Sequence, residues 1–248
     1  IQRCDWSSDV CSSDLISAAW PDRLSFKARW RGETVAVQTR LVGEMWVTSV
    51  LAAIAGAIAA GVGIRDAVAA IEKIEPVSGR NSVHFTDGGP VLICGTIKAP
   101  NASIPVDLEV LAAARAPRKT LVLGNISDYS GDGTPKYKNA ARLALAAGAR
   151  VIGVGKNATT IRRIAKDYAA GDVLTFPSVK EAHDFLVADC VPGEFVLLKG
   201  AASTKLERIA LNWKNETNCW VEDCGKKYCD DCDFLQASRK LPKKRAAA

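Results

Sequence analysis

Residues 119–155, KTLVLGNISDYSGDGTPKYKNAARLALAAGARVIGVG, carry the pattern that best predicts the fold. It opens with a short apolar run, passes through a polar, glycine-rich segment into a helical pattern, and closes with a second apolar run. A strand, a helix and a strand joined in this way favour parallel pairing of the two strands, with the helix packed on the sheet. We therefore interpret this stretch as one βαβ unit.

The same alternation of strand and helix continues on both sides of this unit. It predicts an α/β fold, a Rossmann-like, mainly parallel sheet with helices on both faces. Ligands of such sheets collect at the carboxyl ends of strands, so the loops after Ile93, Leu123 and Leu198 are the places where we expect a site. The predicted strands are 89–96, 119–126, 150–155, 172–176 and 194–200, and the predicted helices are 104–116, 137–149, 159–170 and 179–190.

Upstream of this module the sequence no longer alternates strand and helix. Residues 24–41 alternate apolar and polar side chains around Gly32, which predicts a β-hairpin. A buried, alanine-rich helix is expected within 47–64 and a second helix over 64–75. The 47–64 run is near the minimum length for a membrane span, but its alanine, glycine and hydroxyl side chains favour a helix of a soluble α/β protein. We expect no membrane span.

The first fifteen residues do not read as part of a fold. DWSSDVCSSDL, residues 5–15, matches letter for letter the translation of a common sequencing adapter. We treat 1–15 as an adapter-derived artefact and expect a piece of a longer protein to follow it. The expected domains are then 16–78, 79–213 and a cysteine-rich, basic tail over 214–248.

Composition points to an ordinary globular protein. Hydrophobic residues make up 48% of the chain and charged residues 24%. The net charge of +6 is mild and owes something to the closing run RKLPKKR, residues 239–245, which we interpret as a solvated tail. We expect no nucleic-acid partner.

The strongest local signal is in the tail. Cys219, Cys224, Cys229 and Cys232 have the spacing C-x4-C-x4-C-x2-C. Four thiolates this close in sequence can close a tetrahedral zinc site, which would supply folding free energy to a segment with few apolar residues. An iron–sulfur site and two disulfides are the alternatives. We expect a structural role and a reducing compartment.

No phosphate-binding P-loop is present in the sequence. The nearest imitation is VIGVGKN, residues 151–157, which lacks the first glycine of the motif and has Asn157 where a magnesium-binding Ser or Thr belongs. We interpret it as the end of a strand.

Five blocks in order nevertheless resemble one family. They are LVGEMWVTSVLAAIAGAIAAGV (41–62), EPVSGR (75–80), LICGTIKAPNASI (92–104), KTLVLGNISDYSG (119–131) and PGEFVLLKGAASTKLERI (192–209). Together they resemble the Mur ligases, and most of all the branch that joins D-alanyl-D-alanine to a UDP-muramoyl tripeptide. The resemblance runs from about Leu24 to Leu211, covering the end of the central ATPase domain and the whole C-terminal domain.

The resemblance implies an ATP-dependent ligase that forms a peptide bond through an acyl phosphate, in the cytoplasm, in or near peptidoglycan synthesis. Its partners would be a nucleotide, a UDP-muramoyl-peptide-like substrate and an amino acid or dipeptide. ATP and Mg²⁺ would be bound mainly by an upstream domain, so this chain alone is expected to be inactive.

Site residues follow from the same resemblance. Arg80 falls where the family has an arginine that reaches the ATP phosphates. Met45, Trp46 and Ser49 replace family residues that hold adenine; Trp46 either stacks on the base or is a core tryptophan. Two ends of predicted strands would border the amine substrate, with Thr96, Lys98, Asn101 and Ser103 at one and Lys199 at the other.

Some positions depart from the family. Cys94 replaces an aspartate expected on the ribose, and Lys98 is new: it contacts a phosphate or a substrate carboxylate, or is only solvated. These departures leave a second hypothesis open, a non-catalytic Mur-derived binding module with a zinc-stabilised tail. A folate- or cyanophycin-synthesising relative of the same superfamily is a weaker third.

Overall fold

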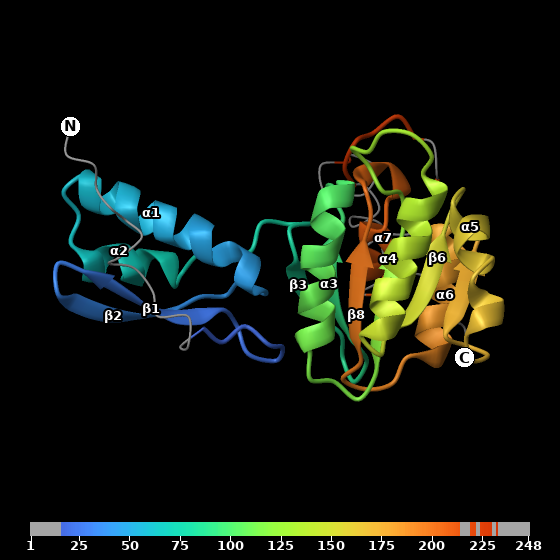
Figure 1. Ribbon diagram of the computed structural model, residues 1–248, viewed down its shortest axis with the longest axis horizontal. Coiled ribbons are helices and arrows are strands. Elements are labelled where there is room, and N and C mark those ends of the chain that lie inside the picture. The colour runs from blue at the N-terminus through green and yellow to red at the C-terminus, as the bar shows by residue number, and fades with distance from the viewer. Residues whose placement is uncertain (1–15, 214–218, 222–223, 230–231, 233–248) are drawn as a thin grey trace, which may run out of the picture. The chain divides into compact units, whose positions relative to one another are not determined.

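The computed structural model describes residues 16–213, 219–221, 224–229 and 232 (Figure 1). The adapter-like stretch 1–15, the basic closing run and much of the predicted domain 214–248 lie outside these residues. The chain divides into two compact units. One comprises the residues up to Val77 with Ala113–Arg115, and the other Ser78–Ala112 with the residues from Ala116 onward.

The first unit opens with the predicted hairpin. Strands β1 (Ser25–Trp30) and β2 (Glu33–Gln38) pair antiparallel and are joined by Arg31 and Gly32, both with positive φ. Two such residues give a tight turn whose twist matches that of the strands, and glycine adopts this conformation without strain. Phe26, Ala28 and Val37 point into the core of the unit.

Helices α1 (Val47–Ala59) and α2 (Ile64–Ile71) complete the first unit. The expectation of a buried α1 was wrong, because Val50 and Ile54 are buried while most of the helix is half-buried or exposed. Its alanines are short, so only the branched side chains on one face reach the core. Within the described residues no helix is both long and apolar enough to cross a membrane.

The second unit is built on a six-stranded sheet in the order β3-β4-β8-β5-β6-β7. All neighbouring pairs are parallel except β3 with β4, which are antiparallel. The parallel strands were predicted, but β3, a short edge strand of mixed polarity, was not. The strands are β3 (Ser82–Phe85), β4 (Val91–Gly95), β5 (Lys119–Leu123), β6 (Arg150–Val154), β7 (Val173–Phe176) and β8 (Phe195–Lys199).

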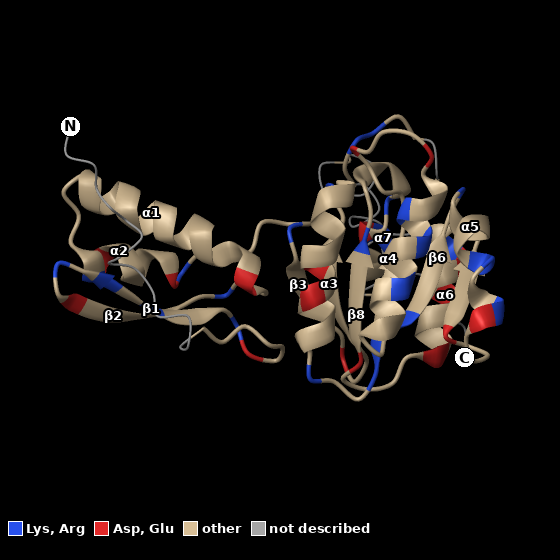
Figure 2. Cartoon of the chain, viewed as in Figure 1, with Lys and Arg blue, Asp and Glu red and all other residues tan. Residues whose placement is uncertain are grey.

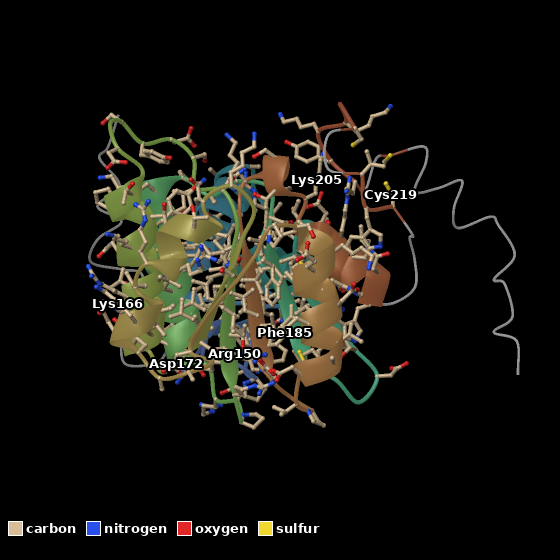
Figure 3. All side chains as sticks on the ribbon, turned by 90° about the vertical axis from the view of Figure 1, so that its right-hand side faces the viewer. Arg150, Lys166, Asp172, Phe185, Lys205 and Cys219 are labelled. Carbon is tan, nitrogen blue, oxygen red and sulfur yellow. The ribbon has the colours of Figure 1, made fainter. Side chains whose placement is uncertain are left out.

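Helices cover both faces of this sheet. Helices α3 (Ile104–Ala113), α4 (Thr134–Ala146) and α5 (Ala158–Arg162) lie on one face, and α6 (Val179–Asp189) and α7 (Glu207–Trp213) on the other (Figures 1 and 3). Helix α5 is shorter than the predicted helix over 159–170, because a separate 3₁₀ turn forms at Ala165–Asp167. In the view of Figure 2, charges of both signs are interspersed over this unit.

A buried ion-pair network joins the amino ends of the strands. Glu194 is fully buried and accepts hydrogen bonds from Nε and Nη2 of Arg118 at 2.9 and 2.7 Å and from Nη2 of Arg150 at 3.1 Å. Thr120 donates a further hydrogen bond to it. Burial works to raise the pKa of Glu194, but the hydrogen bonds and the charge of Arg150 outweigh it and hold the pKa below its ordinary range. The network stabilises the end of the sheet opposite the predicted site.

Candidate functional site

The parallel strands of the second unit bring their following loops together at one edge of the sheet. We call this the carboxyl edge: the loops 96–101 after β4, 124–133 after β5, 155–157 after β6 and 200–206 after β8. Strand β8 lies between β4 and β5, and the chain leaves β4 and β8 toward opposite faces of the sheet. Such a reversal opens a crevice at the carboxyl ends, which is where α/β sheets bind ligands.

Arg80 is held at the end of β4 by its glycine neighbour. The backbone N–H groups of Thr96 and Ile97 both donate to the carbonyl of Gly79, at 3.0 and 3.4 Å. Gly79 has φ of +68°, and a Cβ there would lie 2.7 Å from Cγ1 of Ile97, so only glycine fits. The backbone that leads into Arg80 is therefore fixed beside the 96–101 loop, and the Arg80 side chain is exposed.

The predicted substrate residues of the 96–103 segment differ in accessibility. Thr96 is 3% exposed and belongs to the packing of the strand end, whereas Lys98 is exposed. Asn101 and Ser103 are half-buried. The N–H of Asn101 donates to the Ser127 carbonyl at 2.9 Å, and this ties the loop after β4 to the loop after β5.

Lys199 is engaged inside the protein. It is 5% exposed, and its Nζ lies 2.6 Å from Oδ2 of Asp107 and 3.1 Å from the carbonyl of Lys98. Asp107 also accepts a hydrogen bond from Asn81 at 3.4 Å. The ammonium group of Lys199 thus joins α3, β8 and the loop after β4 instead of projecting from the surface.

A cavity of about 370 Å³ opens at the ends of β5, β6, β7 and β8. The sequence predicted a site at the loops after Leu123 and Leu198. It did not predict that the ends of β6 and β7 and the tail line the same cavity, because these segments are distant in sequence and meet only in the folded chain. Its lining includes Asn125, Lys156, Lys180, Ser203, Thr204 and Trp220.

Asn125 and Tyr137 organise the floor of this cavity. Asn125 donates from Nδ2 to Ser203 at 3.1 Å and from its backbone to Oγ1 of Thr204 at 2.8 Å. The Tyr137 hydroxyl accepts from the Ile126 backbone at 2.8 Å and from Asn157 at 2.7 Å. Burial raises the pKa of Tyr137, so its phenol is neutral at physiological pH. These neutral bonds hold the loops after β5, β6 and β8 in register.

Most backbone N–H groups of the loop after β8 are engaged within the protein. The N–H groups of Ala201, Ala202, Thr204 and Lys205 donate to backbone carbonyls. Lys205 has φ of +59°, so the 3₁₀ turn at Ala202–Thr204 ends before α7 begins. Helix α7 begins after this turn, at Glu207.

Trp46 and Ser49 belong to the first unit. Trp46 is half-buried and packs against that unit's core, as expected of a core tryptophan. Ser49 is exposed on α1. Whether either contacts adenine stays a prediction.

The four tail cysteines lie together against α7. All four are in the reduced thiol form, and with Arg208 they line one cavity of about 10 Å³. Burial raises the pKa of the neighbouring Glu207 carboxyl. Over the described part of the chain, no three His, Cys, Asp or Glu side chains are grouped as a ready-made metal site.

Comparison with known proteins identifies the architecture. The chain superposes on the UDP-N-acetylmuramoylalanyl-D-glutamyl-2,6-diaminopimelate–D-alanyl-D-alanyl ligase of Acinetobacter baumannii with a TM-score of 0.69 and 21% identity, over 84% of this chain and 45% of that one. The chain has the Mur ligase fold. No family model and no curated protein sequence matches it.

Two further Mur-type structures agree. The MurF ligase of Thermotoga maritima, solved in complex with ADP, matches with a TM-score of 0.63 and 13% identity over 78% of this chain and 44% of its own. A pseudomurein peptide ligase type C of Methanothermus fervidus matches with a TM-score of 0.54 and 16% identity, over 76% of this chain and 39% of its own. The chain therefore spans less than half the length of the Mur ligases it resembles.

Proposed function

We propose that this chain supplies the amine-substrate domain of an ATP-dependent amide ligase of the Mur type. The observation that carries the proposal is the position of Arg80, exposed and fixed by Gly79 beside the loop after β4, at the carboxyl edge of a sheet with the Mur ligase fold. A guanidinium stays charged and binds phosphate oxygens through a fork of donors, which suits contact with ATP.

The residues present fit one end of that nucleotide better than the other. Arg80 provides a cation for the phosphates, and Lys98 adds a second exposed cation on the adjacent loop. Cys94, at the position where the family has a ribose-binding aspartate, is 1% exposed and packs in the core beneath the sheet edge. This chain therefore contributes to the phosphates and leaves the ribose to other groups.

In this role the carboxyl edge binds the amine substrate and holds it against an acyl phosphate. The neutral network around Asn125 and Tyr137 fixes the loops, while Arg80 and Lys98 offset the negative charge of phosphate and carboxylate. ATP bound with Mg²⁺ supplies the phosphoryl group that activates the carboxylate. A cytoplasmic location and a UDP-muramoyl-peptide-like acceptor belong to the same proposal.

ATP turnover tests the proposal in two arms. The chain alone, which has no phosphate-binding loop, should release no phosphate from ATP. A chimera in which it replaces the matching part of the A. baumannii ligase should release phosphate only when an amine substrate is added. In that chimera Arg80→Ala should lose on the order of 10²–10³ in rate, with Arg80→Lys intermediate.

A second candidate is a binding module without catalysis, which the burial of Cys94 favours. A folded chimera that binds ATP but releases no phosphate with any amine would support this module. Phosphate release by the chain alone would contradict the division of labour between the domains.

A further inference from the structure

Two buried cations flank the start of α7. Arg208 is 3% exposed and Lys205 is 5% exposed. Neither forms a salt bridge with a carboxylate in the described ranges. The carboxyl group of Glu207 between them is buried and interacts electrostatically with Lys205 and with Cys229. A buried charge is costly unless it is paired and hydrogen-bonded. Within the described residues, the hydrogen-bonding groups next to these two cations are sulfurs and carbonyls of the tail.

Sulfur atoms take the place of the carboxylate at Arg208. Its Nε lies 3.2 Å from Sγ of Cys229 and its Nη2 lies 3.8 Å from Sγ of Cys224. Its remaining Nη1 donates to the Val221 carbonyl at 2.5 Å. The guanidinium therefore faces thiol groups and a carbonyl of the tail.

Lys205 anchors the same segment from the other side. Its Nζ donates to the carbonyl of Lys227 at 3.0 Å and to the carbonyl of Lys226. Figure 3 shows Lys205 and Cys219 at the same end of the unit, opposite the end that carries Arg150 and Phe185. Both buried cations are thus directed toward the loop that carries the cysteines.

We propose that Cys219, Cys224, Cys229 and Cys232 bind one Zn²⁺ ion as four thiolates. Each thiol gives up its proton to water when the ion binds, four Zn–S bonds form, and no group changes its oxidation state. The resulting centre carries two negative charges, and Arg208 and Lys205 supply two positive ones. The sulfurs already line one cavity of about 10 Å³, which has room for an ion but not for a small molecule.

Binding requires the four side chains to close inward. The thiols share the walls of the cavity but do not yet form one coordination sphere, whereas Zn–S bonds are about 2.3 Å long. Arg208 would keep its N–H···S hydrogen bonds and so orient Cys224 and Cys229, the role that outer hydrogen-bond donors play at metal sites. A closed site of four thiolates leaves no open position, so the ion is structural.

The ion would also shape the carboxyl edge. Trp220 follows Cys219 directly, lines the 370 Å³ cavity and packs on His183 with ring centroids 5.0 Å apart. Fixing Cys219 fixes Trp220, and with it one wall of the cavity. The tail then belongs to the same site as the loops after β5 and β8.

Metal analysis of the purified full chain tests this. Elemental analysis and native mass spectrometry should find one zinc ion per chain, and replacement by Co²⁺ should give the absorption bands of tetrahedral thiolate coordination. Cys224→Ser and Cys229→Ser should each lose the zinc. Cys190→Ser, which changes a cysteine at the opposite edge of the sheet, should keep it. Arg208→Leu should weaken zinc binding about 10- to 100-fold, with Arg208→Lys between.

Three results would overturn the proposal, and all come from the unmutated chain, so a variant that fails to fold does not blur them. The first is absence of zinc after expression with zinc supplied and no uptake on addition. The second is iron and inorganic sulfide in place of zinc. The third is a mass showing that the tail cysteines have been oxidised to disulfides.

Discussion

The buried ion pair between Lys199 and Asp107 connects β8, α3 and the loop after β4 at the carboxyl edge. Both side chains are less than a tenth exposed, and the Nζ–Oδ2 distance is 2.6 Å. Removing one partner leaves the other charge buried without compensation, which costs far more than removing both.

Asp107→Ala should therefore lower the free energy of unfolding by about 3–5 kcal/mol. The double variant Lys199→Met, Asp107→Leu should lose much less, because no charge stays buried. Urea unfolding of the two variants beside the unmodified chain measures the difference. Equal losses in both would show that packing, and not charge, is what the pair contributes.

The Glu194 carboxylate predicts how stability depends on pH. Its pKa in the folded protein lies below the ordinary value, since Arg118, Thr120 and Arg150 outweigh the effect of burial. Its contribution is fully present above the unfolded pKa of about 4.3 and is lost as the pH falls through the lower, folded pKa. The urea midpoint should fall in that acidic range, and Glu194→Gln should flatten the fall. An unchanged slope in Glu194→Gln would contradict this assignment, and the exposed Glu109→Gln serves as its control.

Residue roles were harder to predict than residue positions. The sequence placed Lys199 correctly at a strand end, but its partner Asp107 lies on a distant helix and no local pattern links the two. The same holds for Arg208, whose neighbours in sequence say nothing of the sulfurs it faces. Partners of this kind are set by the tertiary fold, so spacing alone could not assign them.

At the scale of elements, the ends of β5 and β8 are joined by close packing of small residues. A Cβ on Gly124 would lie 2.6 Å from Cγ2 of Thr204, and a Cβ on Gly200 would lie 3.2 Å from Cα of Gly124. The two backbones approach too closely for any side chain, as often happens at ligand-binding strand ends.

Gly124→Ala should cost about 1–3 kcal/mol of stability, because Thr204 must move or clash. The matched control is Gly56→Ala in α1, where nothing lies within 4 Å of the new methyl group. There alanine should stabilise the helix by up to about 1 kcal/mol. Thermal unfolding that shows the same sign for both would contradict the contact at Gly124.

The sequence predicted those elements in which apolar residues recur at a clear spacing or in short runs. The hairpin around Gly32 and the five parallel strands follow from alternation and from short apolar runs, since both reflect local burial. Strand β3 was missed because an edge strand needs little apolar character. The exposed face of α1 was missed because alanine is compatible with either environment.

At the scale of the molecule, strand order is the feature that makes the site. Placing β8 between β4 and β5 collects Arg80, Lys98, Asn125 and the start of α7 around one edge of the sheet. Sequence predicted this edge as the place for a ligand, because parallel strands end there. It did not predict that the tail forms one wall of the cavity, since Trp220 reaches that place only through tertiary packing.

On the proposed function, this edge binds the amine substrate of a Mur-type ligase. The most direct measurement is a titration of the ¹⁵N-labelled chain with D-alanyl-D-alanine, followed by NMR. We expect saturable shifts of the amides in 96–103, 124–133 and 200–206 and none around Glu194 at the opposite edge. Lys98→Ala should bind the dipeptide more weakly. Absence of saturable shifts in the carboxyl-edge loops, or shifts confined to the Glu194 edge, would contradict it.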